Sequence, residues 1–328
     1  MRWMSFAAIP GVLCLFAALP QVQPPPEETS PTIQVDVDFV NILFSVRDKK
    51  GALIPNLGKE DFAVFEEGKH QEVKYFVRET GLPLTMGLLV DVSRSQENLI
   101  DIERRAAYEF FSQVLKEKDL AFLISFGSES ELLQDFTGSP RLLQRGLEDL
   151  RVKTSVGGLH PGPVPTANRP KGTVLYDAVY LAATEKLRSE VGRKAIILIT
   201  DGNDQGSMMS RDQAIEAAQR SDVIIYSIFY EDRSFGSGSG FYYSGDEGTL
   251  RRMSEETGGR VFRVDRKHTL DSIFDEIQNE MRSQYAIGYT PLNEARDGSF
   301  RRIEIRPKNK DLKVQARKGY YAGARLKK

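Results

Sequence analysis

Residues 83–95 read PLTMGLLVDVSRS, and this stretch decides the fold. Residues 83–90 form an apolar run of strand length, which predicts a strand buried on both faces. The run ends in a carboxylate and two hydroxyls at alternate positions: Asp91, Ser93 and Ser95. Because alternate side chains of an extended chain share a face, we expect these oxygens to converge. Magnesium and manganese prefer oxygen ligands, so the three oxygens are candidate ligands of such an ion. The alternative interpretation is that Asp and Ser only end the strand and cap the next helix.

After Asp91 the hydrophobic pattern alternates between amphipathic helices and buried strands. Strands are predicted at 120–126, 132–136, 194–200, 222–230 and 259–264, and helices at 98–117, 140–150, 174–187, 211–220, 250–257 and 269–284. Strands joined by crossover helices predict a doubly wound, mostly parallel sheet with helices on both faces, which is a Rossmann-like α/β fold. The helix at 98–117 is expected to bury Ile100, Ile102, Ala106, Phe110, Phe111 and Leu115.

Two β segments flank this α/β region, one at 32–81 and one at 285–328. In the first, Glu67-Gly68 is predicted as a hairpin turn between strands at 63–65 and 73–77. Neither segment has enough strands to close a core of its own. We therefore predict that the two segments pair into one sandwich-like module, with the domain at 82–284 inserted between them.

The composition is that of an ordinary globular protein, with 40% hydrophobic and 28% charged residues. The 45 basic and 46 acidic residues give a net charge of −1, so nothing favours nucleic acid or an anionic surface as a partner. Basic residues gather near the carboxy terminus and are expected on a solvated strand face; they are Arg301, Arg302, Arg306, Lys308, Lys310, Lys313, Arg317 and Lys318.

Residues 1–20 are interpreted as a secretory signal peptide, because Arg2 precedes an apolar core too short to span a bilayer comfortably. Residues 21–31 (QVQPPPEETSP) follow as a Pro-rich linker. The single cysteine, Cys14, lies in the leader, so a mature chain would contain no disulfide and no cysteine site. We therefore expect an extracytoplasmic protein, periplasmic or secreted, with membrane contact only through an uncleaved leader.

Two further oxygen donors are expected near Asp91. In an open parallel sheet, ligands bind beyond the carboxyl ends of the strands. Asp201 follows the buried run KAIILIT (194–200), and Thr173 stands at the start of a helix in the sequence KGT. The five residues together form an all-oxygen set suited to a hard divalent cation: Asp91, Ser93, Ser95, Thr173 and Asp201.

This order and spacing resemble the von Willebrand factor type A domain and its metal-ion-dependent adhesion site. The family pattern is Asp-x-Ser-x-Ser after the first central strand, then a Thr in a later loop, then a Thr-Asp-Gly turn; here these stand as DVSRS, KGT and ITDG. The resemblance covers 82–284, and the flanks look like those of a bacterial group of exported proteins that carry this domain. Two features depart from the family: Arg94 stands where a Gly is common, and the loop before Thr173 is extended.

The resemblance implies a protein-binding module rather than an enzyme. A Mg²⁺ (or Mn²⁺) ion held by Asp91, Ser93, Ser95, Thr173 and Asp201 would bridge to an Asp or Glu carboxylate of a protein partner, and Arg94 could pair with that carboxylate or crowd the site. Asp177 and Asp204 are expected to cap or turn the chain rather than bind the ion.

Two alternatives stay open. One is a metal-assisted hydrolase with Asp91 as nucleophile, because aspartates at strand ends do such work. The other is a scaffold with a degenerate site. The three histidines lie in different segments, so neither a catalytic triad nor a zinc site is indicated.

Overall fold

A computed structural model describes residues 39–79, 81–152, 172–231 and 244–323, all within one compact unit at 38–328. The predicted leader, the linker, the loop at 154–171 and most of a Gly/Ser/Tyr-rich loop expected at 234–245 lie outside these residues. Among the described helices, none combines the length and apolar character needed to cross a membrane.

The core of the α/β part is a six-stranded sheet with the order β10-β9-β8-β5-β6-β7. Only β7 runs antiparallel to its neighbour. All eight residues of β5 are buried, as the apolar run at 83–90 predicted. The strands are β5 (Leu84–Asp91), β6 (Leu120–Phe126), β7 (Ser130–Thr137), β8 (Arg193–Thr200), β9 (Val223–Phe229) and β10 (Val261–Arg263).

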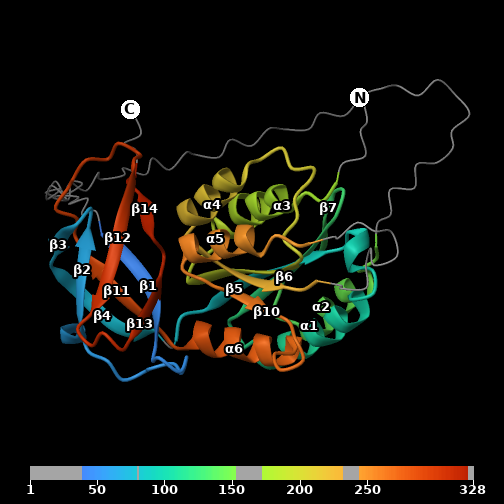
Figure 1. Cartoon of the computed structure of the whole chain (residues 1–328), viewed down its shortest axis with the longest axis horizontal. Coiled ribbons are helices and arrows are strands. Elements are labelled where there is room, and N and C mark those ends of the chain that lie inside the picture. Colours follow the sequence, from blue (N-terminus) through green and yellow to red (C-terminus); the bar gives the residue numbers. More distant parts are fainter. Residues whose placement is uncertain (1–38, 80, 153–171, 232–243, 324–328) are drawn as a thin grey trace, which may run out of the picture. The chain divides into compact units, whose positions relative to one another are not determined.

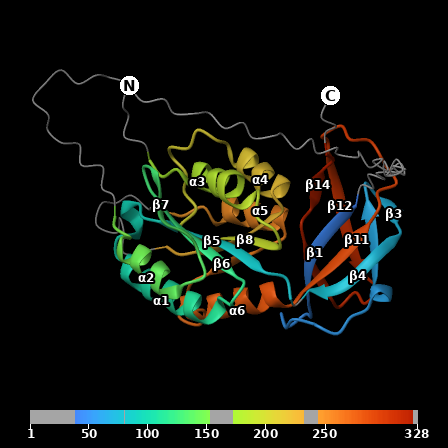
Figure 2. The same ribbon diagram turned by 180° about the vertical axis from the view of Figure 1, so that it is seen from behind.

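Helices cover both faces of this sheet, as Figures 1 and 2 show. One face packs against α1 (Ile100–Val114), α2 (Pro140–Glu148) and α6 (Leu270–Arg282). The other packs against α3 (Leu175–Leu181), its π-helical continuation η3 (Ala182–Leu187), α4 (Arg211–Arg220) and α5 (Glu247–Thr257). The predicted doubly wound α/β fold is therefore confirmed.

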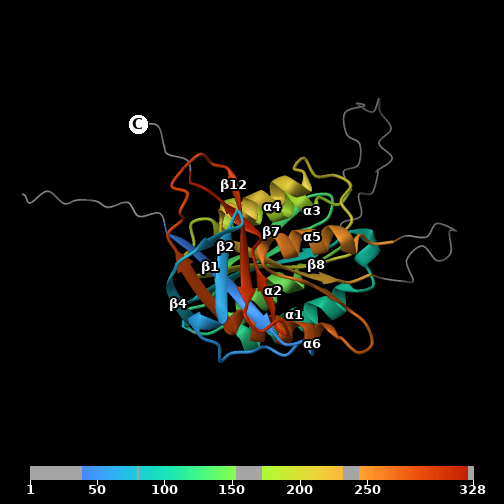
Figure 3. The same cartoon turned by 60° about the vertical axis from the view of Figure 1, so that its left-hand side comes forward.

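The flanking segments form two four-stranded sheets of mixed origin (Figure 3). One has the order β13-β1-β11-β4 and the other β14-β12-β2-β3. Their bounds are β1 (Val40–Arg47), β2 (Phe62–Glu66), β3 (Lys69–Gln71), β4 (Val73–Glu79), β11 (Gln284–Tyr289), β12 (Phe300–Pro307), β13 (Lys313–Ala316) and β14 (Gly319–Tyr321), with a short 3₁₀ turn η1 (Lys59–Asp61) before β2. Strands from both ends of the chain pair directly, and both sheets contribute to one apolar cluster.

The predicted hairpin in the first flank is wrong in its second strand. Glu67 and Gly68 do make the turn, with φ of +48° and +77°. The strand that returns is the three-residue β3, whereas β4 crosses to the other sheet and pairs with β11. Packing explains the crossing: Phe76 of β4 stacks on Tyr285 of β11 and on Phe62 of the opposite sheet, so β4 helps to close the shared core.

The prediction that Arg301 lies on a solvated strand face is also wrong. Residues along β12 alternate, and Arg301 points inward with Ile303 and Ile305. Only 3% of Arg301 is exposed, and its guanidinium contacts the buried carboxylate of Glu66 at 3.5 Å. Arg302 and Arg306 are exposed, as predicted.

Candidate metal centre

Two neighbouring parallel strands bring Asp91 and Asp201 together. Val90 of β5 pairs with Ile199 of β8, so the next residues of both strands reach the same edge of the sheet. Asp91 accepts a hydrogen bond from the Thr200 hydroxyl at 2.6 Å. Asp201 directly follows Thr200, and both aspartates are buried. The register of the sheet thus builds the carboxylate pair that the sequence predicted.

Ser93 and Ser95 join this pair through a short turn. The Ser93 amide donates to Asp91 at 2.9 Å, and the two serine hydroxyls lie 3.0 Å apart. Ser95 then donates to Asp201 at 2.6 Å. Four of the five predicted residues are therefore linked by hydrogen bonds.

The prediction that an extended chain places Ser95 beside Ser93 is wrong. A 3₁₀ turn, η2 (Arg94–Gln96), begins directly after Ser93. The turn is closed by a hydrogen bond from the Gln96 amide to the Ser93 carbonyl at 2.9 Å. The tight turn, rather than strand alternation, carries Ser95 back toward Asp201.

Thr173 belongs to the same edge through its backbone. Its carbonyl accepts hydrogen bonds from the amides of Gln205 (3.0 Å) and Gly206 (3.1 Å), which belong to the loop after Asp201. Gly172 allows this approach, since a Cβ there would lie 2.4 Å from the Gln205 Cβ. Within the described ranges, no hydrogen bond joins the Thr173 hydroxyl to the other four residues.

Gly202 fixes the turn that carries Asp201. Its φ of +83° lies in the left-handed region, and a Cβ there would meet the Asp246 carbonyl oxygen at 2.4 Å. The Asp246 amide donates to the Asp201 carbonyl at 2.8 Å, and the Asn203 amide donates to the Asp201 carboxylate at 3.0 Å. The Asp-Gly sequence is therefore required both for the backbone conformation and for the packing of this turn.

The electrostatics of the site favour a cation. Burial, together with repulsion from Asp201, raises the pKa of Asp91 to about 7, against the effect of hydrogen bonds from Thr200 and Ser93. The donor set contains two carboxylates and three hydroxyls, and no nitrogen or sulfur. A hard divalent cation would relieve the repulsion and prefers these oxygens, so the residues fit magnesium or manganese. Within the part of the chain that the structure describes, no group of three or more His, Cys, Asp or Glu could hold a metal.

Sequence reasoning missed three buried polar residues beside the site: Thr200, Gln96 and Glu103. Gln96 donates to Asp201 at 3.1 Å. Glu103 is fully buried, and neither of its carboxylate oxygens has a hydrogen-bond partner among the residues that the structure describes. Burial, and after it the charge of Asp91, raises its pKa well above the usual value.

The position of Glu103 also corrects the predicted face of α1. The predicted apolar residue Ile102 is 47% exposed, whereas Glu103 lies on the buried face. The signal was available, because Glu103 lies three residues after Ile100 and three before Ala106, at helical spacing. Helical spacing therefore places Glu103 on the buried face, even though a carboxyl by its residue type favours solvent.

We expect Glu103→Gln to stabilise the metal-free protein by about 1–3 kcal/mol near pH 8, and by less near pH 5. The folded state holds the Glu103 proton more tightly than the unfolded state. The wild type therefore loses stability as the pH rises above the pKa that Glu103 has in the unfolded chain. The glutamine does not titrate, so the variant does not lose stability in this way. Urea unfolding in chelator at both pH values measures the effect. Glu109→Gln, an exposed change on the same helix, is the control; equal responses of the two variants would contradict the prediction.

Asp204 makes the turn contacts that were predicted, whereas Asp177 does not cap its own helix and instead accepts hydrogen bonds from a loop that follows later in the chain. Asp177 accepts hydrogen bonds from the backbone amides of Met208 (3.0 Å) and Met209 (2.8 Å). Asp204 accepts from the Ser207 hydroxyl and, at 3.2 Å, from the Tyr176 amide. These bonds tie the loop after Asp201 to the start of α3 and so hold Thr173 near the sheet edge.

Comparison with known proteins identifies a domain family in this region. The family model of the von Willebrand factor type A domain matches residues 165–276. The prediction that the chain carries such a domain is therefore confirmed. The match includes Thr173 and Asp201 and begins after the Asp91 motif; the predicted bounds at 82–284 stay a prediction.

Similar proteins are found both among sequences and among solved structures. An uncharacterized protein of Borreliella burgdorferi is 25% identical over 232 residues, which are 67% of this chain and 59% of that protein. BatB from Bacteroides thetaiotaomicron is 18% identical with a TM-score of 0.46, over 60% of this chain and 97% of that chain. Proximal thread matrix protein 1 from the mussel byssus, solved with a zinc-occupied MIDAS motif, is 14% identical with a TM-score of 0.46, over 65% of this chain and 48% of that chain.

Proposed function

We propose that this chain, whose residues 165–276 match the von Willebrand factor type A domain, is a metal-ion-dependent protein-binding module of the adhesion type. The observation that carries the proposal is the set of oxygens at one sheet edge. Ser95 Oγ lies 3.0 Å from Ser93 Oγ and 2.6 Å from Asp201 Oδ2, and Asp91 completes the set. Magnesium is the proposed ion and manganese the alternative, because both prefer oxygen ligands.

The proposed roles of the five residues follow from their charges. Asp91 and Asp201 provide the negative charge that attracts the cation. Ser93, Ser95 and Thr173 provide neutral oxygens, which leave the ion short of strong donors. A bound Mg²⁺ or Mn²⁺ supplies an electrophilic position open to an oxygen from outside. We propose that an Asp or Glu carboxylate of a partner protein occupies this position, and that the module binds rather than catalyses.

Arg94 supports an acidic partner. It is exposed in the η2 turn, between the two serines of the site. An arginine there is placed to pair with the same partner carboxylate, because a guanidinium can form two parallel hydrogen bonds to it. Met208, which is 79% exposed on the loop after Asp201, offers apolar contact beside this charge.

The experiment combines metal titration with partner capture. We expect calorimetry to detect Mg²⁺ or Mn²⁺ binding to the wild type, and Thr173→Ala to weaken it by about 10–100-fold. The immobilised chain is expected to retain an envelope protein with Mg²⁺ and to release it on addition of chelator. Arg94→Gln should reduce that capture and leave metal affinity unchanged.

Three outcomes would contradict the proposal. If the wild type binds neither ion more tightly than Thr173→Ala, the site is a degenerate scaffold. Metal-dependent turnover of generic phosphoester substrates would instead favour the hydrolase. If chelator does not change the capture of the partner, partner binding does not depend on the metal centre.

We also propose that the chain is exported. The support is the leader pattern at 1–20 and the single cysteine within it. Fractionation of source cells into cytoplasm, periplasm and medium tests this proposal, and accumulation of the chain in the cytoplasm would contradict it.

A further inference from the structure

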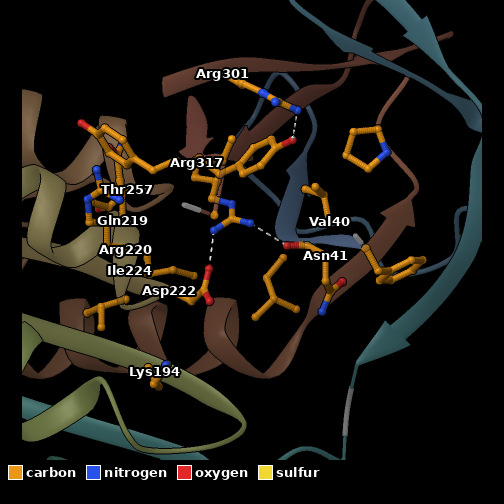
Figure 4. A pocket seen from close by; sticks show the side chains of 18 of the residues that line it. Val40, Asn41, Lys194, Gln219, Arg220, Asp222, Ile224, Thr257, Arg301 and Arg317 are labelled. Carbon is orange, nitrogen blue, oxygen red and sulfur yellow. Dashed lines mark hydrogen bonds and ion pairs between the residues drawn. The ribbon is translucent and has the colours of Figure 1, made fainter. Parts of the chain in front are cut away.

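A second candidate site lies at the opposite end of strand β8. Thr200 ends this strand at the metal centre, whereas Lys194 lies near its beginning. A pocket of about 540 Å³ opens there, and its walls come from the α/β part and from the flanking sheets (Figure 4). This volume lies within the range of small-molecule sites, which often form where two structural parts meet.

Lys194 is the most informative residue of the pocket. It is 8% exposed, and Val191, Val223 and Ile224 line the same cavity. Burial lowers the pKa of its ammonium group, although the charges of Asp222 and Glu190 oppose this effect. Within the described ranges its ammonium makes no hydrogen bond and no ion pair. A partly desolvated cation without a direct partner is less favourable than one in water, so an anion beside it would stabilise the protein.

Asp222, an acidic residue of the same pocket whose charge acts on Lys194, is already engaged by another cation. Arg317 binds the Asp222 carboxylate, and its other nitrogen donates to the Asn41 carbonyl at 2.8 Å, as the dashed lines in Figure 4 show. In that view Lys194 lies below this pair. Asp222 is thereby held toward Arg317 by a charge-assisted hydrogen bond. Lys194 keeps its charge available to a ligand.

The remaining lining adds positive charge and aromatic surface. Five basic side chains line the pocket against two acidic ones, Glu190 and Asp222. Arg220 lies 4.0 Å from the centre of the Tyr321 ring, and Arg301 donates to the Tyr320 hydroxyl at 3.3 Å. The two tyrosines and the aliphatic residues around Lys194 suit a ligand with an apolar part.

We propose that this pocket binds a small organic anion, with a carboxylate or phosphate group against Lys194 and an apolar part along Val191 and Ile224. The binding does not depend on the metal centre. Since the walls belong both to the α/β part and to the flanking sheets, a bound anion stabilises the packing between them.

Thermal unfolding in chelator, at constant ionic strength, tests this inference with three probes: phenylacetate, phenyl phosphate and the neutral benzyl alcohol. We expect at least one anion to raise the melting temperature by about 3 °C at ten times its dissociation constant, with no rise from the alcohol. Comparison of the two anions identifies the acidic group that the pocket prefers.

Lys194→Met keeps the side-chain length and removes the charge. We expect it to weaken anion binding by at least about tenfold and to raise the melting temperature without ligand. Lys318→Met, at an exposed lysine between β13 and β14 that does not line the pocket, should bind like the wild type. If the anions and the alcohol shift the melting temperature of the wild type equally, the inference is overturned, and this comparison does not require Lys194→Met to fold. An unchanged anion affinity in Lys194→Met would also overturn it.

Discussion

Asp91→Asn is expected to abolish metal binding and, at the same time, to stabilise the metal-free protein. We expect the affinity for Mg²⁺ to fall by at least about 100-fold, because one of only two carboxylates of the site is lost. The metal-free variant should gain about 1–3 kcal/mol near pH 8. Calorimetry measures the first effect, and urea unfolding in chelator measures the second.

The gain in stability has a definite pH range. Because burial and Asp201 raise the folded pKa of Asp91 to about 7, the wild type loses stability as the pH rises from the unfolded pKa toward 7. Above that value the cost is constant. The asparagine lacks this proton equilibrium, so the difference between the variants should appear over the same range. Asp101→Asn, an exposed change on α1, is the control and should alter neither quantity. A destabilised Asp91→Asn would show that the carboxylate acts structurally rather than as a charge held for a cation.

Glu280→Ala is expected to destabilise the fold by about 3–5 kcal/mol, because it removes one partner from a buried ionic cluster. Glu280 lies in α6 and is fully buried. Its carboxylate binds Arg47 of β1 and, at 3.0 Å, Arg260. It also accepts hydrogen bonds from Ser45 at 3.2 Å and from Tyr226 at 3.5 Å. These contacts join a flanking sheet to the α/β part. The substitution takes the Glu280 carboxylate away from both arginines and leaves Arg260 with its pairing to Glu276.

Glu276 on the same helix supplies the matched control. It pairs with Arg260 at 2.7 Å but is 42% exposed, so Glu276→Ala should cost less than about 1 kcal/mol. Urea unfolding compares the two variants. A loss of similar size in both would mean that burial does not set the strength of the Glu280 cluster. A single transition in Glu280→Ala is also expected, since a second one would mean that the two parts unfold separately.

The metal centre was predictable where it depends on strand ends. Each of Asp91 and Asp201 follows an apolar run long enough to be a buried strand, and parallel strands end at one edge. The place of each aspartate at the end of a predicted strand was therefore enough to predict that the two lie at the same edge of the sheet. Thr200 was harder to predict, because its role depends on the pairing of β5 with β8, and an apolar run does not state which strands are neighbours.

The burial of some residues cannot be predicted from residue type. Ile102 is apolar yet 47% exposed, and Glu103 and Arg301 are charged yet buried. Residue type favours one environment by a few kcal/mol at most, and the packing of neighbouring elements can exceed that preference. The buried guanidinium of Arg301 is compensated by the carboxylate of Glu66, a residue far away in the sequence that lies 3.5 Å from it.

Two features followed from the sequence without the structure. Buried strands alternate with amphipathic helices along the chain, and acidic or hydroxyl residues stand at two strand ends. Local periodicity and residue type suffice for these features, since both act over a few neighbouring residues. The tertiary structure was needed to show that β4 leaves its hairpin, that the Ser95 hydroxyl donates to Asp201, and that Lys194 lies in a pocket lined by both the α/β part and the flanking sheets. Each of these depends on contacts between segments distant in sequence, whose energies no local pattern contains.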